Sequence, residues 1–238
     1  MNPPRLSADE RRAAILAAAM PLFAVHGFAA TTTRQIADSA GVSEALLYRH
    51  FPSKEDLYMA LHEFCCVHAE VFSRFIDEIK PSTSTLVHSV YYIMNSIFLH
   101  KQNHPDDPVN NEHFCRLMIN SLLDDGRFAR MFIKDQVMPW MDLWAASAKS
   151  AEAAGDMNPG IAIENRLWFT HHLAVMLAVN HLPETCVIPY ACNAQNLCDE
   201  AVLFSLRGMG LTESAIATHY NPSAIQLFTK KIFEALNP

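Results

Sequence analysis

The sequence predicts an all-α fold made of two parts, a small N-terminal part and a larger helical part. Apolar residues recur with helical spacing along most of the 238 residues, whereas the alternation typical of strands is nearly absent. Glycine and proline interrupt this pattern at intervals, as expected for helices joined by loops. Half of the residues are hydrophobic and 18% are charged, so the chain can bury a sizeable core.

Charge is distributed unevenly along the chain. Residues 1–60 carry six basic and six acidic side chains, whereas the whole sequence has 18 Lys and Arg against 25 Asp and Glu, a net charge of −7. A net-acidic protein can still bind nucleic acid where its cations converge. The run Leu173–Leu182 is shorter than the roughly 20 apolar residues of a membrane span, and residues 1–12 lack a secretory signal. We therefore expect a cytoplasmic protein with no membrane partner.

The first predicted helix has one apolar stripe. Gly27 follows this stripe and is expected to end the helix, while Pro21 within it predicts a kink, since proline lacks a backbone donor. The stripe, at helical spacing, consists of Ile15, Ala18, Ala19, Leu22 and Phe23.

Three short helical signals follow in close succession. Thr32 and Gln35 have the spacing of a capping box, which predicts the start of a second helix that ends at Gly41. Ser43 can cap a third helix, and Pro52 stops it. A fourth helix is predicted to open at 53–56 and to continue to a proline at position 81. Six further helical stretches are expected at 83–103, 109–124, 127–154, 160–181, 194–208 and 222–236.

Two short helices joined by a glycine turn are typical of a helix-turn-helix, whose second helix lies in the major groove of DNA. The segments Thr32–Ala37, Ala40–Ser43, Leu47–Phe51 and Lys54–Leu57 resemble the DNA-binding domain of TetR-family transcriptional repressors. The resemblance implies a DNA-binding domain at 9–69, with its helix-turn-helix at about 32–51. It also implies a helical ligand-binding and dimerisation domain at 70–238.

Residue types at the start of the second and third helices suit contacts with DNA. Thr33 can hold a phosphate through its hydroxyl and backbone, and Arg34 can clamp a phosphate or a guanine edge. In the exposed turn after Ser43, Glu44 can accept a hydrogen bond from a cytosine amino group. Ala45 and Leu46 can contact a thymine methyl group. Leu46 can instead cover the edge of the core.

The resemblance implies phosphate-backbone contacts for a second group of residues. Such contacts fix the register on the duplex and make affinity fall with salt. The matching positions are Tyr48, His50 and Lys54, to which Arg49 adds a further cation.

The resemblance also implies a mostly apolar effector pocket and a four-helix dimer interface in the second part. Helical clusters provide candidates for the pocket, although each also suits ordinary helix packing. The pocket candidates are Phe64, His68, Phe72, Tyr91, Asn95, Phe98, Phe114, Met118, Trp144, His172 and Met176. The interface candidates, on 160–181 and 194–208, are Leu167, Thr170, Ala174, Leu177, Leu203 and Leu206.

Together with these patterns, the resemblance implies a homodimeric repressor that binds a near-palindromic operator and is released by a small, mostly apolar effector. Its recognition helices should lie one duplex turn, about 34–36 Å, apart. A constitutive DNA-binding protein and a thiol-based sensor remain alternatives. A helical enzyme would need a convergent catalytic set, and the sequence shows none, so we expect no catalysis, metal or cofactor.

Overall fold

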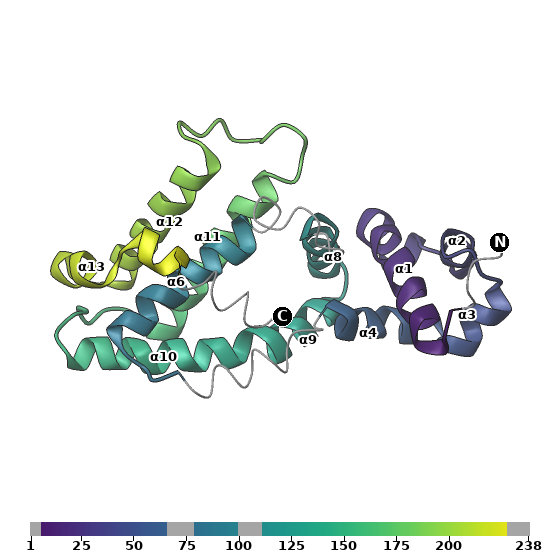
Figure 1. The fold of residues 1–238 in the computed structure, drawn as a ribbon, viewed down its shortest axis with the longest axis horizontal. Coiled ribbons are helices and arrows are strands. Elements are labelled where there is room, and N and C mark those ends of the chain that lie inside the picture. Colours follow the sequence, from purple (N-terminus) through teal and green to yellow (C-terminus); the bar gives the residue numbers. More distant parts are fainter. Residues whose placement is uncertain (1–5, 66–78, 100–110, 228–238) are drawn as a thin grey trace. The chain divides into compact units, whose positions relative to one another are not determined.

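The computed structural model describes residues 6–65, 79–99 and 111–227, and the regular elements in these ranges are helical (Figure 1). Contacts divide the chain into two compact units. The first joins Met1–Ala69 to Asp106–Gln136, and the second joins Glu70–Pro105 to Val137–Pro238. The predicted division placed everything beyond residue 69 in one domain. The structure differs because residues 111–136 pack with the N-terminal helices.

Helix α1 (Ala8–Ala30) forms the centre of the first unit. Its start is fixed by a capping box in which Ser7 Oγ accepts from the Glu10 amide at 3.2 Å and Glu10 accepts from the Ser7 amide at 2.7 Å. The helical conformation is interrupted at Gly27, with φ 74°, whereas Pro21 lies within the helix. The interruption therefore falls at the predicted stop, and the chain resumes helical structure to residue 30.

In the described ranges α1 is also the helix whose length and apolar composition would suffice to cross a membrane. Core helices of soluble proteins meet the same criterion. Here α1 packs against three other helices of its unit, which is the arrangement of a core helix.

Helices α2 (Thr33–Ser39), α3 (Glu44–His50) and α4 (Lys54–Cys65) begin as predicted. The fourth helix was predicted to continue to residue 81, but residues 66–78 of that stretch lie outside the described residues and residues 79–81 are not helical. The predicted capping box is confirmed, since the Thr32 hydroxyl accepts from the Gln35 amide and the Gln35 side chain accepts from the Thr32 amide. Ser43 Oγ accepts from the Leu46 amide at 3.2 Å, which confirms the predicted cap of α3. The buried side chains that hold these helices against α1 are Ile36, Ala37, Leu47, Phe51, Leu57 and Leu61.

The predicted helix 127–154 is divided in the structure. It consists of α9 (Arg127–Phe132), a π-helix η1 (Ile133–Val137) and α10 (Met138–Ala153). The boundary between the two units falls within the π-helix, so α9 belongs to the first unit and α10 to the second. Helix α8 (Asn111–Leu123) packs along α1, where Asn120 Nδ2 donates to the backbone oxygen of Ala24 at 2.8 Å.

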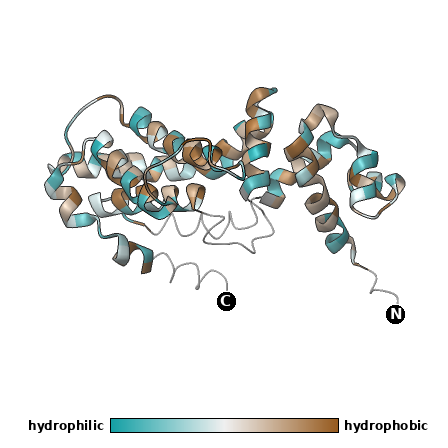
Figure 2. Ribbon diagram, turned by 90° about the horizontal axis from the view of Figure 1, so that it is seen from above, coloured by the Kyte–Doolittle hydropathy of each residue, from teal (hydrophilic) through white to brown (hydrophobic). Residues whose placement is uncertain are grey.

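The second unit is arranged around α6 (Thr83–Phe98), which contacts α10, α11, α12 and α13. Helices α11 (Ile163–Asn180) and α12 (Ala194–Met209) agree with the predicted stretches. Helix α13 (Glu213–His219), capped by Thr212, was not predicted. Of the stretch predicted at 222–236, residues 222–227 are helical and the rest lies outside the described residues. Both hydrophobic and hydrophilic residues occur along these helices, as amphipathic packing requires (Figure 2).

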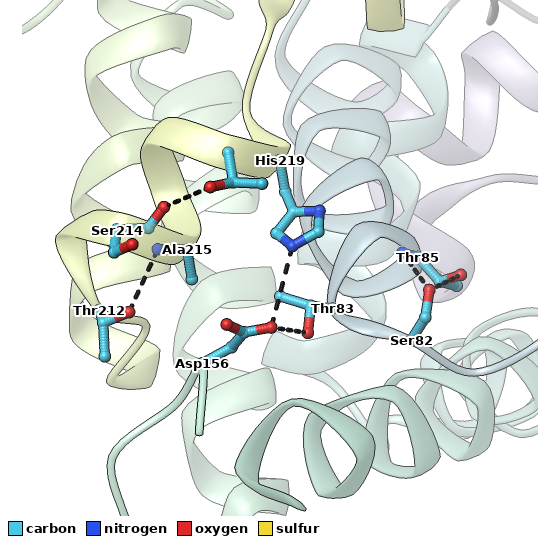
Figure 3. A network of polar contacts seen from close by, with 9 residues as sticks. Ser82, Thr83, Thr85, Asp156, Thr212, Ser214, Ala215 and His219 are labelled. Carbon is cyan, nitrogen blue, oxygen red and sulfur yellow. Dashed lines mark hydrogen bonds and ion pairs between the residues drawn. The ribbon is translucent and has the colours of Figure 1, made fainter. Parts of the chain in front are cut away.

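A polar cluster joins α13, the start of α6 and the turn after α10 (Figure 3). Asp156 Oδ2 accepts from the buried Thr83 hydroxyl at 2.6 Å and lies 3.8 Å from His219 Nε2. The Thr212 amide donates to the Asp156 backbone oxygen at 2.9 Å. These contacts link segments distant in sequence, so they fix the position of α13 on the second unit.

Candidate nucleic-acid interface

Helix α3 separates an inward from an outward face. Leu47 is fully buried, whereas Glu44, Ala45 and Arg49 are exposed and Leu46 is half-buried. The apolar contact with α1 therefore leaves the start and outer side of α3 accessible to solvent. This is the arrangement that a recognition helix needs in order to enter a groove.

The start of α2 is hydrogen-bonded to the outer face of α3. Thr33 Oγ1 donates to Glu44 Oε1 at 3.1 Å and lies 3.2 Å from the phenolic oxygen of Tyr48. Tyr48 is 46% exposed, so its ring stands at the surface rather than in the core. Three residues predicted to face DNA therefore lie together, and Arg34, on the same short helix as Thr33, is also exposed.

Lys54, a predicted phosphate contact, has a structural role. Its Nζ donates to the backbone oxygens of Phe28 at 2.9 Å and Thr31 at 3.0 Å, and it lies 4.3 Å from the centre of the Phe28 ring. The ammonium group thus connects the first turn of α4 with the end of α1. It has three donors, so one remains for another acceptor.

Arg12 is a cation at this end of the unit that sequence reasoning did not single out. Its guanidinium lies 4.5 Å from the centre of the Phe51 ring, and Nη1 is 3.5 Å from the backbone oxygen of His50. His50 itself is half-buried. No local pattern pairs residue 12 with residue 50, so only the folded structure brings this positive charge to the end of α3.

The predicted effector residues do not form one site in the structure. Phe64, Phe114 and Met118 pack against the core of the first unit, because α4 and α8 both belong to that unit. His172 and Met176 are exposed on α11, so their prediction as interior pocket residues is wrong for the single chain. His68 and Phe72 lie outside the described residues.

The remaining pocket candidates lie within the second unit. Tyr91, Phe98 and Trp144 are buried, and Asn95 Nδ2 donates to the Tyr91 backbone oxygen of its own helix. Burial raises the pKa of Tyr91. The indole nitrogen of Trp144 is buried and has no hydrogen-bond partner among the described residues. Ser147 Oγ, three residues further along α10, is in the same state.

Most of the predicted dimer residues face the interior of their own chain. Leu167, Thr170, Ala174, Leu177 and Leu206 are each less than 5% exposed, because α11 and α12 pack with this side against each other and α6. Their prediction as contacts to a second chain is therefore corrected. Leu203 is half-buried. The outer sides of the same helices carry Phe169, Met176 and Phe204, which are 61%, 53% and 70% exposed.

Two of the described cysteines are buried enough to shift their pKa. Burial raises the pKa of Cys115 to about 11 and that of Cys198 to about 12, which disfavours the reactive thiolate. Within the described ranges no three His, Cys, Asp or Glu side chains are grouped as metal ligands would be.

A helix-turn-helix with an exposed second helix, followed in the chain by a separate helical unit, defines a DNA-binding regulator. A profile of the family described as bacterial regulatory proteins of the TetR family matches residues 15–61. The transcriptional repressor KstR2 of Mycolicibacterium smegmatis is 30% identical over 155 residues, which are 65% of this chain and 71% of that protein. The chain belongs to the TetR family of transcriptional regulators.

Other relatives match over shorter ranges or in fold. The activator FasR of M. smegmatis is 49% identical over 57 residues, 24% of this chain and 26% of its own length, so the match spans about a quarter of that relative. The structure of a γ-butyrolactone receptor aligns with a TM-score of 0.60 at 21% identity, covering 92% of this chain and 97% of that one. AibR with isovaleryl coenzyme A and operator DNA aligns at 0.54 and 16% identity, covering 82% and 97%. Of these proteins, FasR is named as a transcriptional activator and AibR is known in complex with operator DNA.

Proposed function

We propose that this protein is a cytoplasmic, ligand-responsive transcriptional repressor that binds a near-palindromic operator as a homodimer. The observation that carries the proposal is the outer face of α3, where Ala45 and Leu46 are accessible beside Tyr48 and Arg49. In a major groove, the two apolar side chains suit thymine methyl groups, whereas Tyr48 and Arg49 reach the flanking phosphates. Thr33, Arg34 and the third donor of Lys54 extend the phosphate contacts.

Repression rather than activation is favoured by the KstR2 relative, because its match covers much more of both chains than that of the activator FasR. The homodimer is supported by the exposed aromatic residues on the outer sides of α11 and α12. Large exposed apolar side chains on helices that pack together are candidates for an interface. Phe169 and Phe204 are its proposed anchors.

An effector site in the second unit is supported by two buried, unpartnered groups. Buried polar groups without partners are rare in folded proteins, and a bound molecule can satisfy them. Trp144 Nε1 can only donate, so the effector should carry an oxygen acceptor on an otherwise apolar body. AibR, which shares the fold, is known with isovaleryl coenzyme A and DNA.

Selection from a pool of random duplexes tests the DNA-binding proposal. The purified protein should enrich sequences that contain an inverted repeat, with half-sites about one duplex turn apart. Leu46→Ala should change the enriched half-site, whereas Arg49→Met should lower the affinity for all duplexes and reduce its dependence on salt. Enrichment without any inverted repeat would argue against a dimeric repressor.

A thermal-shift screen tests the effector proposal. Apolar carboxylic acids, esters and lactones should raise the melting temperature of the wild type. Trp144→Phe, which keeps an aromatic side chain and removes the donor, should lose most of that rise. If Trp144→Phe responds as the wild type does, the indole nitrogen does not bind the effector.

A further inference from the structure

The exposed face shared by α2 and α3 carries a chain of hydrogen bonds that ends on a carboxylate. Thr33 Oγ1 donates to Glu44 Oε1 at 3.1 Å, and the phenolic oxygen of Tyr48 is 3.2 Å from the same Oγ1. A carboxylate only accepts, so the single hydroxyl proton of Thr33 is committed to Glu44. Tyr48 must then donate its proton to Thr33. Both hydroxyl protons therefore point towards Glu44.

We propose that Glu44 is an internal competitor of the DNA phosphate group. It holds the Thr33 and Tyr48 hydroxyls in the free protein and releases them when a phosphate binds. Phosphate oxygens accept hydrogen bonds as carboxylate oxygens do, so one set of hydroxyl protons cannot serve both. This inference rests on the proposed DNA-binding function, and it replaces the cytosine contact expected for Glu44.

The cost of this competition is the same for every DNA sequence. Phosphates are common to all duplexes, so displacing Glu44 lowers the affinity for operator and random DNA by the same factor. The ratio of the two affinities stays unchanged. Glu44 thus weakens binding to operator and other DNA alike, whereas Ala45 and Leu46 determine the preferred sequence.

Glu44 also opposes a phosphate through its charge. A carboxylate about 4 Å from a phosphate in a solvent-exposed site lowers binding about fivefold. Glu44 is exposed, so this effect is screened by salt. The hydrogen-bond competition is local and persists at higher ionic strength.

The test uses the full-length protein and a fluorescent duplex of random sequence, with anisotropy measured over a series of salt concentrations. Glu44→Gln keeps the size of the side chain and removes its charge, and it should tighten binding about fivefold at low salt. Glu55→Gln, an exposed residue on α4 outside the hydrogen-bond chain, removes the same charge and should change binding less than about twofold. Glu44→Ala provides a second variant without an acceptor.

A double-mutant cycle separates competition for the hydroxyls from charge alone. Thr33→Val keeps the branched shape and removes the hydroxyl that links Tyr48 to Glu44. In this background Glu44→Ala, which removes both the acceptor and the charge, should tighten binding less than it does in the wild-type background, and the remaining gain should be that of the charge alone. A gain that is the same in both backgrounds would overturn the role proposed for the hydroxyls.

Two further outcomes distinguish a failure of the competitor role of Glu44 from a failure of the DNA-binding function. If the wild type binds DNA but Glu44→Gln binds no more tightly than Glu55→Gln, or alters the selected half-site, the competitor role is wrong and the DNA-binding function stands. If the folded wild type binds no duplex at low salt, the DNA-binding function itself fails. An increase in affinity with an unchanged half-site supports the proposal.

Discussion

Lys54 Nζ, at the start of α4, donates to the backbone oxygen of Thr31 at 3.0 Å. Thr31 is the residue that follows α1 in the turn before α2. Helix C-terminal carbonyls are unsatisfied within the helix and carry partial negative charge, so a cation is favourable there. Lys54, which was expected to bind phosphate, therefore also holds the start of α4 against the end of α1. Lys54 should therefore contribute to stability as well as to DNA binding. Arg49, the other cation close to the end of α3, should contribute to DNA binding alone.

Lys54→Met should destabilise the first unit, whereas Arg49→Met should not. Lys54 is half-buried and makes two charged hydrogen bonds, each contributing about 1.5–3 kcal/mol at most, while Arg49 is exposed. Urea unfolding should show the loss for Lys54→Met only, and anisotropy should show weaker DNA binding for Arg49→Met. Equal stability of the two variants would contradict the stabilising role of Lys54.

Gly210→Ala should be more harmful than Gly155→Ala. Both glycines have positive φ, 97° and 77°, so alanine is strained by about 1–3 kcal/mol at either position. Space distinguishes them, because a Cβ at 210 would lie 3.0 Å from the Asn158 backbone oxygen and 3.2 Å from Arg166 Nη1, whereas at 155 it would meet nothing within 4 Å. Thermal unfolding of the two variants measures the difference. A lower melting temperature for Gly155→Ala would refute the explanation.

Phe204→Asp should convert the proposed dimer to a monomer. Phe204 is 70% exposed in the single chain, and burying a phenylalanine in an interface contributes about 1.5–3 kcal/mol. Aspartate removes this contribution and places like charges across the interface. Light scattering after size-exclusion chromatography measures the mass. Leu123→Asp, at a residue 80% exposed on the first unit, is the control and should leave the mass unchanged.

Acid should destabilise the second unit through His171. Burial, with a smaller effect of His172, lowers the pKa of His171 from the ordinary 6.5 to about 4, so the unfolded state binds more protons between these values. Its stabilising contribution is complete above pH 6.5 and decreases as the pH falls towards 4, by up to about 1.4 kcal/mol per pH unit.

The measurement is urea unfolding at pH 7 and pH 5. His171→Phe keeps a ring against Trp168, whose centre lies 5.6 Å from that of His171, and removes the titrating group. The variant should lose less stability between the two pH values than the wild type. A loss as large as that of the wild type would show that other groups cause the acid effect.

Local sequence patterns specify the helices and turns of the DNA-binding part. The caps at Thr32 and Ser43 and the turn at Gly41 depend on hydrogen bonds and backbone angles within a few residues. Such interactions are visible in the sequence because partners lie close together along the chain. The inward direction of Leu47 followed from the helical period for the same reason.

The packing of the helices determines which side chains are buried and which polar groups meet at the surface. An apolar stripe on α11 predicts a buried side but not what buries it, and Leu167 and Ala174 turned out to face their own chain. The link between Thr33 and Glu44 joins residues 11 positions apart in the sequence, and that between Lys54 and Thr31 joins residues 23 positions apart. Such contacts depend on how helices pack, and packing is set by the combined shape of many distant side chains rather than by local preference.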